Sequence, residues 1–575
     1  MRHLRAGGVE LIRAVSFIVR DEGWGTYDPE ITGLSVMEAA EDFRVEYEAT
    51  CRDGRQALRY RAAIEGAPDR IVFSAEAEAL TEFATNRAGF VVLHPIAGVA
   101  GEVVEVEHVD GTREQARFPW LIEPYQPFMD IRALVHAPAP PGFAVSCRME
   151  GDTFEMEDQR NWTDASYKTY VRPIGLPWPF TIPKGERFRQ SVAVALHGAA
   201  PADAGESGSR AELVVGGSGV GPGVPRIGLA YDPDRKVPAA LHAILRDLGA
   251  RHLRCRYDPG RTHDARTMAE FAKLAEAIGA ELVLEAVLPT GGPLREEAGR
   301  IAAAAREAGL AFRTVFVSPA PDLRGTLPGS PWPECPKLEE VYAAMRAAFP
   351  GARLGGGTYN FFTELNRKRP LTEGGLLDLV THATCATVHA ADDVSVMETI
   401  ECLPAVIASA QAIAGGAAYH IGPGGIGLRA NPYGADPAEN PANARRAMAH
   451  MDPRQRGLFG AAWHLGFLAQ CARHGVPEVT LASPVGEFGV AYAPMPYAQP
   501  FYDEMGKGVY PLFHVLRAAM RASGRTLRQV EVNGSGVEAL AWEGDGGGVE
   551  LWVANFTSGS RDVSLSGLRR RPRGA

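Results

Sequence analysis

The sequence predicts a three-part protein: an N-terminal antiparallel β-sandwich, a central (β/α)8 barrel of the TIM type and a small C-terminal β-domain. Three observations lead to this fold class. Apolar and polar residues alternate with period two over residues 1–200, as in half-buried strands. Short apolar runs then alternate with helical patterns over residues 225–523. Strand-like runs return over residues 524–575, after the last helical pattern.

The first part shows its strands most clearly near residue 50. Apolar side chains occupy every second position from Phe43 to Cys51, and a turn at Asp53 leads into another alternating run. A second Asp-Gly turn at Asp110 follows a further run of this kind. Gly, Ser and Pro then dominate residues 201–224, apart from one short strand-like run, so we expect this segment to be a linker.

The central part repeats a unit of one strand and one helix. Several helical patterns end at a glycine, as at Gly249, Gly279 and Gly309, where a left-handed helix cap is favoured. Eight strands are predicted to start near Ile227, His252, Leu282, Thr314, Arg353, Ala386, Ala418 and Val479. Eight such units predict a closed barrel, which keeps its chemistry at the carboxyl ends of the strands.

The last helical pattern covers residues 509–522 and precedes three strand-like runs, at 530–532, 537–542 and 549–553. These runs predict the small C-terminal β-domain. The basic end, at residues 568–573, is expected to be a solvated tail.

Composition argues against several partners. The net charge of -10 and a pI near 5.9 give no electrostatic reason to bind nucleic acid. Glu10 and Arg13 interrupt the apolar stretch that a signal peptide would need, and the apolar window 404–419 is too short to span a bilayer. We therefore expect a cytoplasmic protein with no nucleic-acid or membrane partner; nothing in the sequence indicates how many chains associate.

Several common chemistries lack their motifs. The seven cysteines form no C-x-x-C pair, and H-E-x-x-H and G-x-S-x-G are absent. Residues 422–427 match G-x-G-x-x-G, but residues 428–432 do not open a helix that could bind a phosphate. We expect no cofactor and no preformed metal site, although dispersed carboxylates such as Glu364 and Asp392 could act as ligands.

Polar side chains gather where the predicted strands end. His389 and Asp392 follow the sixth strand, and a carboxylate at this spacing can fix the tautomer of an imidazole. Glu364 follows the fifth strand and completes the catalytic candidates. The candidates for substrate binding in the barrel are Tyr359, Asn360, Arg254, His420, Arg429 and Asn431. Each of these residues also has a structural interpretation, such as an ion pair for Arg254 or the start of a solvated helix for Glu364.

The N-terminal part contains an unusual segment, residues 149–170, that is dense in acids, amides and aromatics. Asp158 and Asn161 in this segment are candidates for binding the hydroxyl groups of a sugar-like ring. The alternative is a buttress between domains, with Asp158 and Arg160 paired to the barrel.

Four segments, 150–170, 388–398, 427–434 and 452–463, together resemble the bacterial D-apionate lactonase family. The likeness covers nearly the whole chain in the same three-part order. It implies a hydrolase of a carboxylic ester that opens a small sugar lactone, D-apionolactone, to D-apionate in apiose breakdown. The resemblance assigns no catalytic residues to this chain. The chain departs from similar enzymes after residues 563–566, where it turns basic instead of adding a strand.

Two other functions are compatible with this architecture. A glycoside hydrolase with a TIM barrel would need paired carboxyls, yet residues 316–321 and 420–423, at the ends of strands four and seven, contain no glutamate. A non-catalytic carbohydrate-binding protein would not need the ionisable groups at the mouth. For lactone opening, we expect His389 to act as general base with Asp392 orienting it. Arg429 and Asn360 would hold the oxyanion or substrate hydroxyls, and Glu364 would donate a proton.

Overall fold

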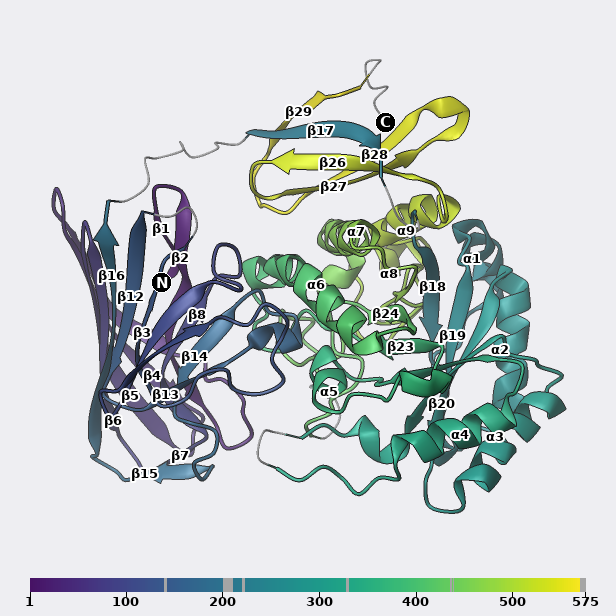
Figure 1. The fold of residues 1–575 in the computed structure, drawn as a ribbon, viewed down its shortest axis with the longest axis horizontal. Helices are drawn as coiled ribbons and strands as arrows, with labels where there is room; N and C mark the ends of the chain where they lie inside the picture. Colours follow the sequence, from purple (N-terminus) through teal and green to yellow (C-terminus); the bar gives the residue numbers. More distant parts are fainter. Residues whose placement is uncertain are drawn as a thin grey trace. The chain divides into compact units, whose positions relative to one another are not determined.

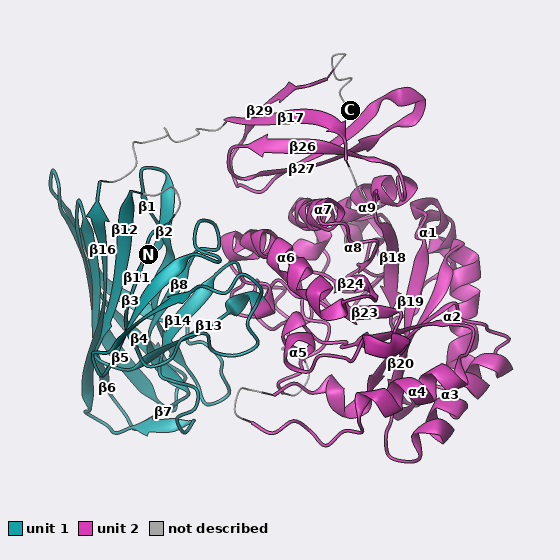
Figure 2. Ribbon diagram, viewed as in Figure 1, with its two compact units in different colours: residues 1–160, 165–206 teal, residues 161–164, 207–575 magenta. Residues whose placement is uncertain are grey.

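The computed structural model describes residues 1–138, 142–199, 210–219, 223–326, 330–434, 437 and 439–568. The chain divides into two compact units, Met1–Arg160 with Ala165–Glu206, and Asn161–Asp164 with Ser207–Ala575 (Figure 2). The basic end predicted at residues 568–573 lies almost wholly outside the described residues, as does much of the predicted linker.

The first unit is the antiparallel, sandwich-like β-structure that the period-two alternation predicts. Fourteen strands form one hydrogen-bonded sheet, and β7 (Phe83–Thr85) pairs separately with β15 (Phe180–Ile182). The fourteen strands are β1 (Arg2–Ala6), β2 (Val9–Arg20), β3 (Glu30–Glu38), β4 (Phe43–Arg52), β5 (Ala57–Ala67), β6 (Arg70–Ala79), β8 (Arg87–His94), β9 (Val103–His108), β10 (Arg113–Arg117), β11 (Ile131–His136), β12 (Phe143–Glu150), β13 (Phe154–Glu157), β14 (Tyr167–Val171) and β16 (Arg187–Gly198). The side chains that the alternation turns inward form its core, where the ring of Phe90 contacts the rings of Phe17 and Phe73.

The second unit contains a closed barrel of eight parallel strands, which confirms the predicted TIM-like fold. The strands are β18 (Arg226–Tyr231), β19 (His252–Tyr257), β20 (Glu281–Leu288), β21 (Thr314–Pro319), β22 (Arg353–Gly357), β23 (Leu379–His382), β24 (Ala418–Gly424) and β25 (Glu478–Leu481). The main helices between and after them are α1 (His242–Leu248), α2 (Ala265–Ile278), α3 (Leu294–Glu307), α4 (Leu338–Ala348), α5 (Phe362–Arg367), α6 (Asp393–Ala414), α7 (Leu458–Arg473) and α9 (Pro511–Arg521), with a short α8 (Tyr502–Met505). The expected glycine caps of α1 and α2 are present, at Gly249 and Gly279 in the left-handed conformation.

Layers of inward-facing side chains fill the barrel. His252 and His420 contact each other near the amino ends of β19 and β24, and both imidazoles bond to the hydroxyl of Thr480. Two residues further along β19, Arg254 extends toward the carboxyl end and stacks on Phe316. This alternation aims every second residue of a strand into the interior.

The sixth barrel strand lies earlier than predicted, and the prediction of its start near Ala386 is wrong. The strand is β23, Leu379–His382, which pairs with β22 on one side and β24 on the other. Residues 386–387 bond instead to the carbonyl of Ile426, in the loop after β24. The β-branched residues near 387 fit a buried loop as well as a strand, so the local pattern could not distinguish the two.

The short strand-like run within the predicted linker is a strand of the C-terminal sheet. β17 (Arg210–Ser218) lies within the segment predicted to be a linker, yet it pairs antiparallel with β26 (Leu527–Asn533) and parallel with β29 (Asp562–Ser566). β27 (Val537–Glu543) and β28 (Val549–Asn555) complete the sheet. Figure 1 shows β17 as a blue-green strand among yellow ones, because its neighbours come from the end of the chain.

Among the described residues one helix, α6, is long and apolar enough to cross a membrane. More than half of its most apolar window is buried, at 56%. It lies between β23 and β24 and packs against both strands and α7, which accounts for its apolar character.

Candidate active site

A cavity of about 1030 Å³ lies at the carboxyl ends of the barrel strands. Its lining comes from residues that follow or end β18, β19, β20, β24 and β25. The charged and polar residues that line it include Asp232, Arg235, Arg254, Arg256, Asp258, Glu285, Arg429, Asn431, His450, Ser483 and Glu487. This is the position at which barrel enzymes keep their catalytic groups.

Two arginines and one carboxylate form the floor of the cavity. Arg254 Nε donates to Glu285 Oε2 over 2.5 Å, and Arg256 Nε donates to Glu285 Oε1 over 2.5 Å. Burial favours the neutral carboxyl, but the guanidinium groups of Arg256 and Arg254 lower the pKa of Glu285 below its usual range. Glu285 is therefore a charged anchor for both arginines and a poor proton acceptor.

Arg429 lines the wall of the cavity, and contacts with two residues fix the orientation of its guanidinium. Its guanidinium lies 4.0 Å from the ring centroid of Phe488 and donates to the carbonyl of Ala482 over 3.1 Å. Burial lowers the pKa of Arg429 to about 9. A guanidinium in this setting can bind a carboxylate or a developing oxyanion strongly, because few waters compete for it.

His450 lies on the same wall, in the long loop between β24 and α7. Its Nδ1 lies 2.8 Å from the carbonyl oxygen of Leu428, and its ring meets Phe488 edge-on at 5.3 Å. Its Nε2 lies 3.8 Å from Oε2 of Glu487. Arg235 in turn binds both oxygens of Glu487, over 2.9 and 3.2 Å.

Glu364 lies in a second, more enclosed cluster at the start of α5. Its Oε1 accepts from the hydroxyl of Tyr433 over 2.6 Å, and that hydroxyl accepts from Trp162 Nε1 over 3.0 Å. Its Oε2 accepts from the backbone N–H of Phe361. Burial raises the pKa of Glu364 to about 7, against the opposing effect of the Tyr433 hydrogen bond.

His389 belongs to this second cluster, and the carboxylate that it contacts differs from the prediction. Its Nδ1 lies 2.7 Å from Asp164 Oδ2, and its ring packs edge-on against Trp162. Asp392 instead caps the amino end of α6, where its side chain accepts from the N–H and hydroxyl of Ser395. Helix capping is the usual role of an aspartate just before a helix, and it explains why the three-residue spacing misled.

Most other predicted residues have structural contacts. Tyr359 donates to the carbonyl of Ala286, and Asn360 donates to that of Asp322. Asn161, in the second unit, accepts from Asn366 and, through its carbonyl, from Thr363.

Three further predicted residues lie in three different places: the cavity, the barrel interior and the first unit. Asn431 lines the cavity, and its side chain also accepts from the N–H of Tyr433. His420 is placed in the barrel interior, near the amino end of β24, because that strand begins only two residues before it. Asp158, in the first unit, is buried and forms a bidentate pair with Arg160.

His450 and Glu487 are the residues that sequence reasoning missed. His450 lies 26 residues after the end of β24, so no strand-end rule points to it (424 to 450). Glu487 lies six residues after the end of β25, in an irregular segment with no motif of its own (481 to 487). The available signal was length, since the connection from β24 to α7 covers more than 30 residues (424 to 458). Loops this long on the catalytic face of a barrel often carry function.

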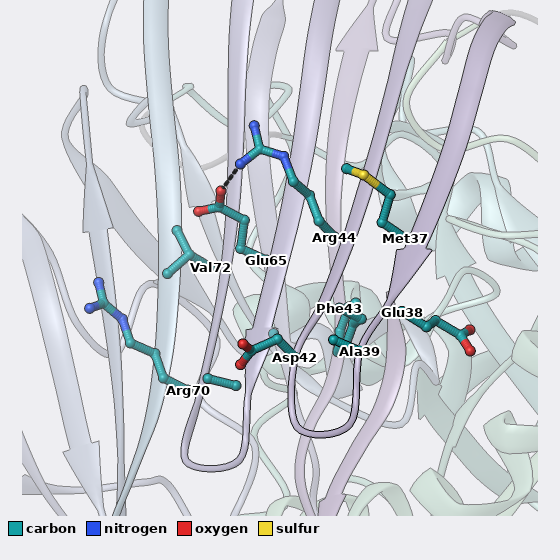
Figure 3. A pocket seen from close by; sticks show the side chains of 11 residues that line it. Met37, Glu38, Ala39, Asp42, Phe43, Arg44, Glu65, Arg70 and Val72 are labelled. Carbon is teal, nitrogen blue, oxygen red and sulfur yellow. Dashed lines mark hydrogen bonds and ion pairs between the residues drawn. The ribbon is translucent and has the colours of Figure 1, made fainter.

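The first unit has a shallower depression of about 650 Å³ near the turns that join β3 to β4 and β5 to β6. Figure 3 shows its charged wall, where Arg44 is paired with Glu65. A Cβ on Gly66 would lie 2.0 Å from the ring of Phe43, so this ring fills the space of the missing side chain. The depression thus arises from strand packing and an exposed ion pair.

No group of three or more His, Cys, Asp and Glu side chains with metal-binding geometry occurs among the residues that the structure describes. Six of the seven cysteines are buried and Cys335 is partly buried, all with free thiols.

Comparison with known proteins connects nearly the whole chain to one family. Residues 1–199 match the family described as D-apionate lactonase, N-terminal domain, and residues 227–524 match D-apionate lactonase, TIM barrel domain. A D-apionate lactonase of Brucella anthropi is 43% identical over 572 residues, which cover 98% of this chain and 91% of the relative.

Solved structures show weaker likeness. A GH36 α-galactosidase of Geobacillus stearothermophilus is 11% identical, with a TM-score of 0.28, and covers 93% of this chain and 80% of its own. A putative aldose 1-epimerase of Escherichia coli is 10% identical, with a TM-score of 0.22, over 33% of this chain and 90% of its own.

Proposed function

Since the chain belongs to the D-apionate lactonase family, we propose that it hydrolyses the ring ester of D-apionolactone to give D-apionate. The protein is then a hydrolase of carboxylic esters in apiose breakdown, with a small lactone as substrate. We also propose that it acts in the cytoplasm.

The observation that carries this proposal is the cavity at the carboxyl ends of the barrel strands. It combines guanidinium donors, Arg256 and Arg429, with an imidazole, His450. Lactone opening requires a base to activate water and donors for the tetrahedral oxyanion. The product is a carboxylate, and guanidinium groups bind carboxylates in a bidentate fashion.

The ends of two barrel strands lack the carboxyl groups that glycoside cleavage would need. β21 ends at Ser318 and Pro319, and β24 ends at Pro423 and Gly424, so neither strand end carries a glutamate. A retaining glycosidase needs two carboxyls about 5–5.5 Å apart, one as acid and one as nucleophile. In this cavity Glu285 stays ionised between two arginines, which makes it a poor proton donor, and both of its oxygens accept hydrogen bonds from them, which makes it a poor nucleophile.

Among the substrate-binding residues predicted from sequence, Arg429, Asn431 and Arg254 line the cavity, and we assign lactone binding to them. His389 and Glu364 remain predictions as base and acid. Neither is among the described residues that line the cavity.

The test is a substrate panel with the purified full-length protein. Acid release from D-apionolactone and other aldonolactones is followed with a pH indicator, beside aryl glycosides of several sugars. We expect rapid acid release from D-apionolactone and no release of the aryl group. Efficient cleavage of a glycoside without lactone turnover would replace this proposal with the glycosidase function.

A further inference from the structure

We propose that His450 is the general base that activates water in the barrel-mouth cavity, and that Glu487 positions both the imidazole and the water. This inference rests on the proposed lactone hydrolysis. It assigns the base to a residue in the long loop after β24.

The tautomer of His450 suits a general base. Its Nδ1 lies 2.8 Å from the carbonyl oxygen of Leu428, and a carbonyl can only accept a hydrogen bond. Nδ1 therefore carries the proton, and Nε2 of the neutral ring has a free lone pair. The residue lines the cavity, and its side chain is 36% exposed, so this lone pair is accessible to substrate and water.

The surroundings of Nε2 leave room for one bound water. Glu487 Oε2 lies 3.8 Å away, too far for a direct hydrogen bond but close enough for one water to bridge the two acceptors. The carboxylate is itself fixed, since Arg235 binds both of its oxygens and only 8% of its side chain is exposed. A water held in this way would donate both hydrogens to protein and direct its oxygen lone pair away from them.

The cavity wall that carries His450 and Arg429 is held in place by an aromatic ring. Phe488 lies between the two candidate groups: its ring meets the imidazole of His450 edge-on and the guanidinium of Arg429 face-on. The base and the oxyanion donor are therefore oriented by one buried ring, 4% exposed. Preorganised groups of this kind need little rearrangement when the reaction occurs.

The charged groups facing His450 are Glu487, Arg429 and Arg235. Burial lowers the pKa of His450 below its ordinary value, 6.5, while Glu487 and the Leu428 carbonyl raise it and the two arginines lower it. The imidazole is thus mainly neutral at pH 7, as a base must be, and Glu487 can stabilise the imidazolium that forms during the reaction.

The step balances without any further reactant. His450 Nε2 takes one proton from water as the water oxygen bonds to the lactone carbonyl carbon, and the carbonyl oxygen becomes an oxyanion facing Arg429. The bond from the carbonyl carbon to the ring oxygen then breaks as the carbonyl reforms. The departing oxygen takes the proton from Nε2, which yields a hydroxyl and a carboxylic acid that ionises.

His389 has a carboxylate at Nδ1, as a general base can have, but it is not among the described residues that line the cavity. It lies in the second cluster, where its ring packs against Trp162. The comparison of the two histidines is therefore part of the test.

The experiment compares His450→Asn, His389→Asn and His474→Asn in the full-length protein. The Asn amide can replace Nδ1 as a donor to the Leu428 carbonyl but cannot act as a base. His474 is a matched control, because its Nδ1 also lies 2.9 Å from a carbonyl, that of Gln470, on an exposed site. We expect His450→Asn to lower kcat for D-apionolactone by about a hundred- to ten-thousand-fold, with the thermal midpoint unchanged.

Glu487→Gln supplies a second measurement that a structural role would not affect. The acidic limb of the wild-type profile of kcat/KM against pH should report the pKa of His450. Loss of the Glu487 charge removes an effect that raises this pKa, so the limb should move to lower pH. An unchanged limb would remove Glu487 from the proposal.

The outcomes distinguish failure of the proposed lactone hydrolysis from failure of the role of His450. If the wild type opens no lactone, the proposed function fails, and the role of His450 fails with it. If the wild type is active and folded His450→Asn keeps its rate within about threefold, only the role of His450 is overturned. A large loss in His389→Asn together with an unimpaired His450→Asn would transfer the base to His389.

Discussion

Glu364 is a carboxyl whose environment favours its protonated form. It is 3% exposed, and its two oxygens contact the Tyr433 hydroxyl and the Phe361 N–H. Its position at the start of a helix could be predicted from sequence. Its partner Tyr433 could not, because this residue lies 69 positions away in a loop whose path depends on the barrel.

Replacing Glu364 with Gln should change how stability depends on pH. Burial raises the pKa of Glu364 from 4.5 to about 7, so the folded protein binds more protons than the unfolded chain between these values. The free energy of unfolding therefore falls as pH rises through this window, by about 1.4 kcal/mol for each pH unit. Gln resembles the protonated acid and removes this loss. We expect the thermal midpoint of Glu364→Gln, relative to wild type, to rise between pH 5 and pH 8.

The control for this measurement is Glu340→Gln. Both glutamates lie in the first turn of a barrel helix, but Glu340 is exposed on α4. A pH-independent difference between Glu364→Gln and wild type would contradict the assignment of a raised pKa.

At the scale of secondary-structure elements, two barrel strands each have a glycine with positive φ at or near their carboxyl end. Gly357 closes β22 with φ of 106°, and a Cβ there would lie 2.3 Å from the Thr381 carbonyl oxygen. Gly422, near the end of β24, has φ of 127°, and its Cβ would lie 2.3 Å from the Thr480 carbonyl oxygen. Both positions need glycine for its conformation and for the close approach of a neighbouring strand.

Gly357→Ala should destabilise the protein by about 1–3 kcal/mol, since it combines a strained φ with a backbone clash. Gly351→Ala is the control, because a Cβ there meets nothing within 4 Å and its φ is not positive. Thermal unfolding of both variants gives the comparison. Equal midpoints would show that β22 can shift to accept a side chain.

The elements also show where sequence patterns stop being sufficient. Seven of the eight barrel strands start within a residue of their predicted positions, because most of them are apolar runs bounded by helix caps and turns. The sixth was misplaced by seven residues (386 against 379), and His389 was consequently assigned to a strand end. Only pairing with β22 and β24 distinguishes the true strand from the buried loop that follows.

At the scale of the whole molecule, segments far apart in sequence complete the second unit. Asn161–Asp164 belongs to it although the residues on both sides belong to the first unit. β17 likewise joins strands more than 300 residues away. The order of the three parts could be predicted from hydrophobic periodicity, but these long-range pairings could not. A strand-like run does not reveal its partners, and four residues leave no distinctive local pattern.

Trp162→Phe should measure how much Asn161–Asp164 contributes to the second unit. Trp162 is buried and donates to the Tyr433 hydroxyl, so its loss should cost about 1–3 kcal/mol. Trp120→Phe is a matched control on an exposed side chain, 69% accessible. We expect a lower thermal midpoint for Trp162→Phe only. Equal shifts in the two variants would mean that the indole contact contributes little.

The most direct test of lactone hydrolysis in the barrel mouth is kcat/KM for D-apionolactone, measured for the wild type, Arg429→Gln and Arg300→Gln. Arg429 lines the cavity, whereas Arg300 is 66% exposed on α3. We expect rapid turnover by the wild type and by Arg300→Gln, and a loss of about a hundred- to a thousand-fold in a folded Arg429→Gln protein. A wild type that is inert to the lactone, or a folded Arg429→Gln protein with unchanged kcat/KM, would contradict lactone hydrolysis in the barrel mouth.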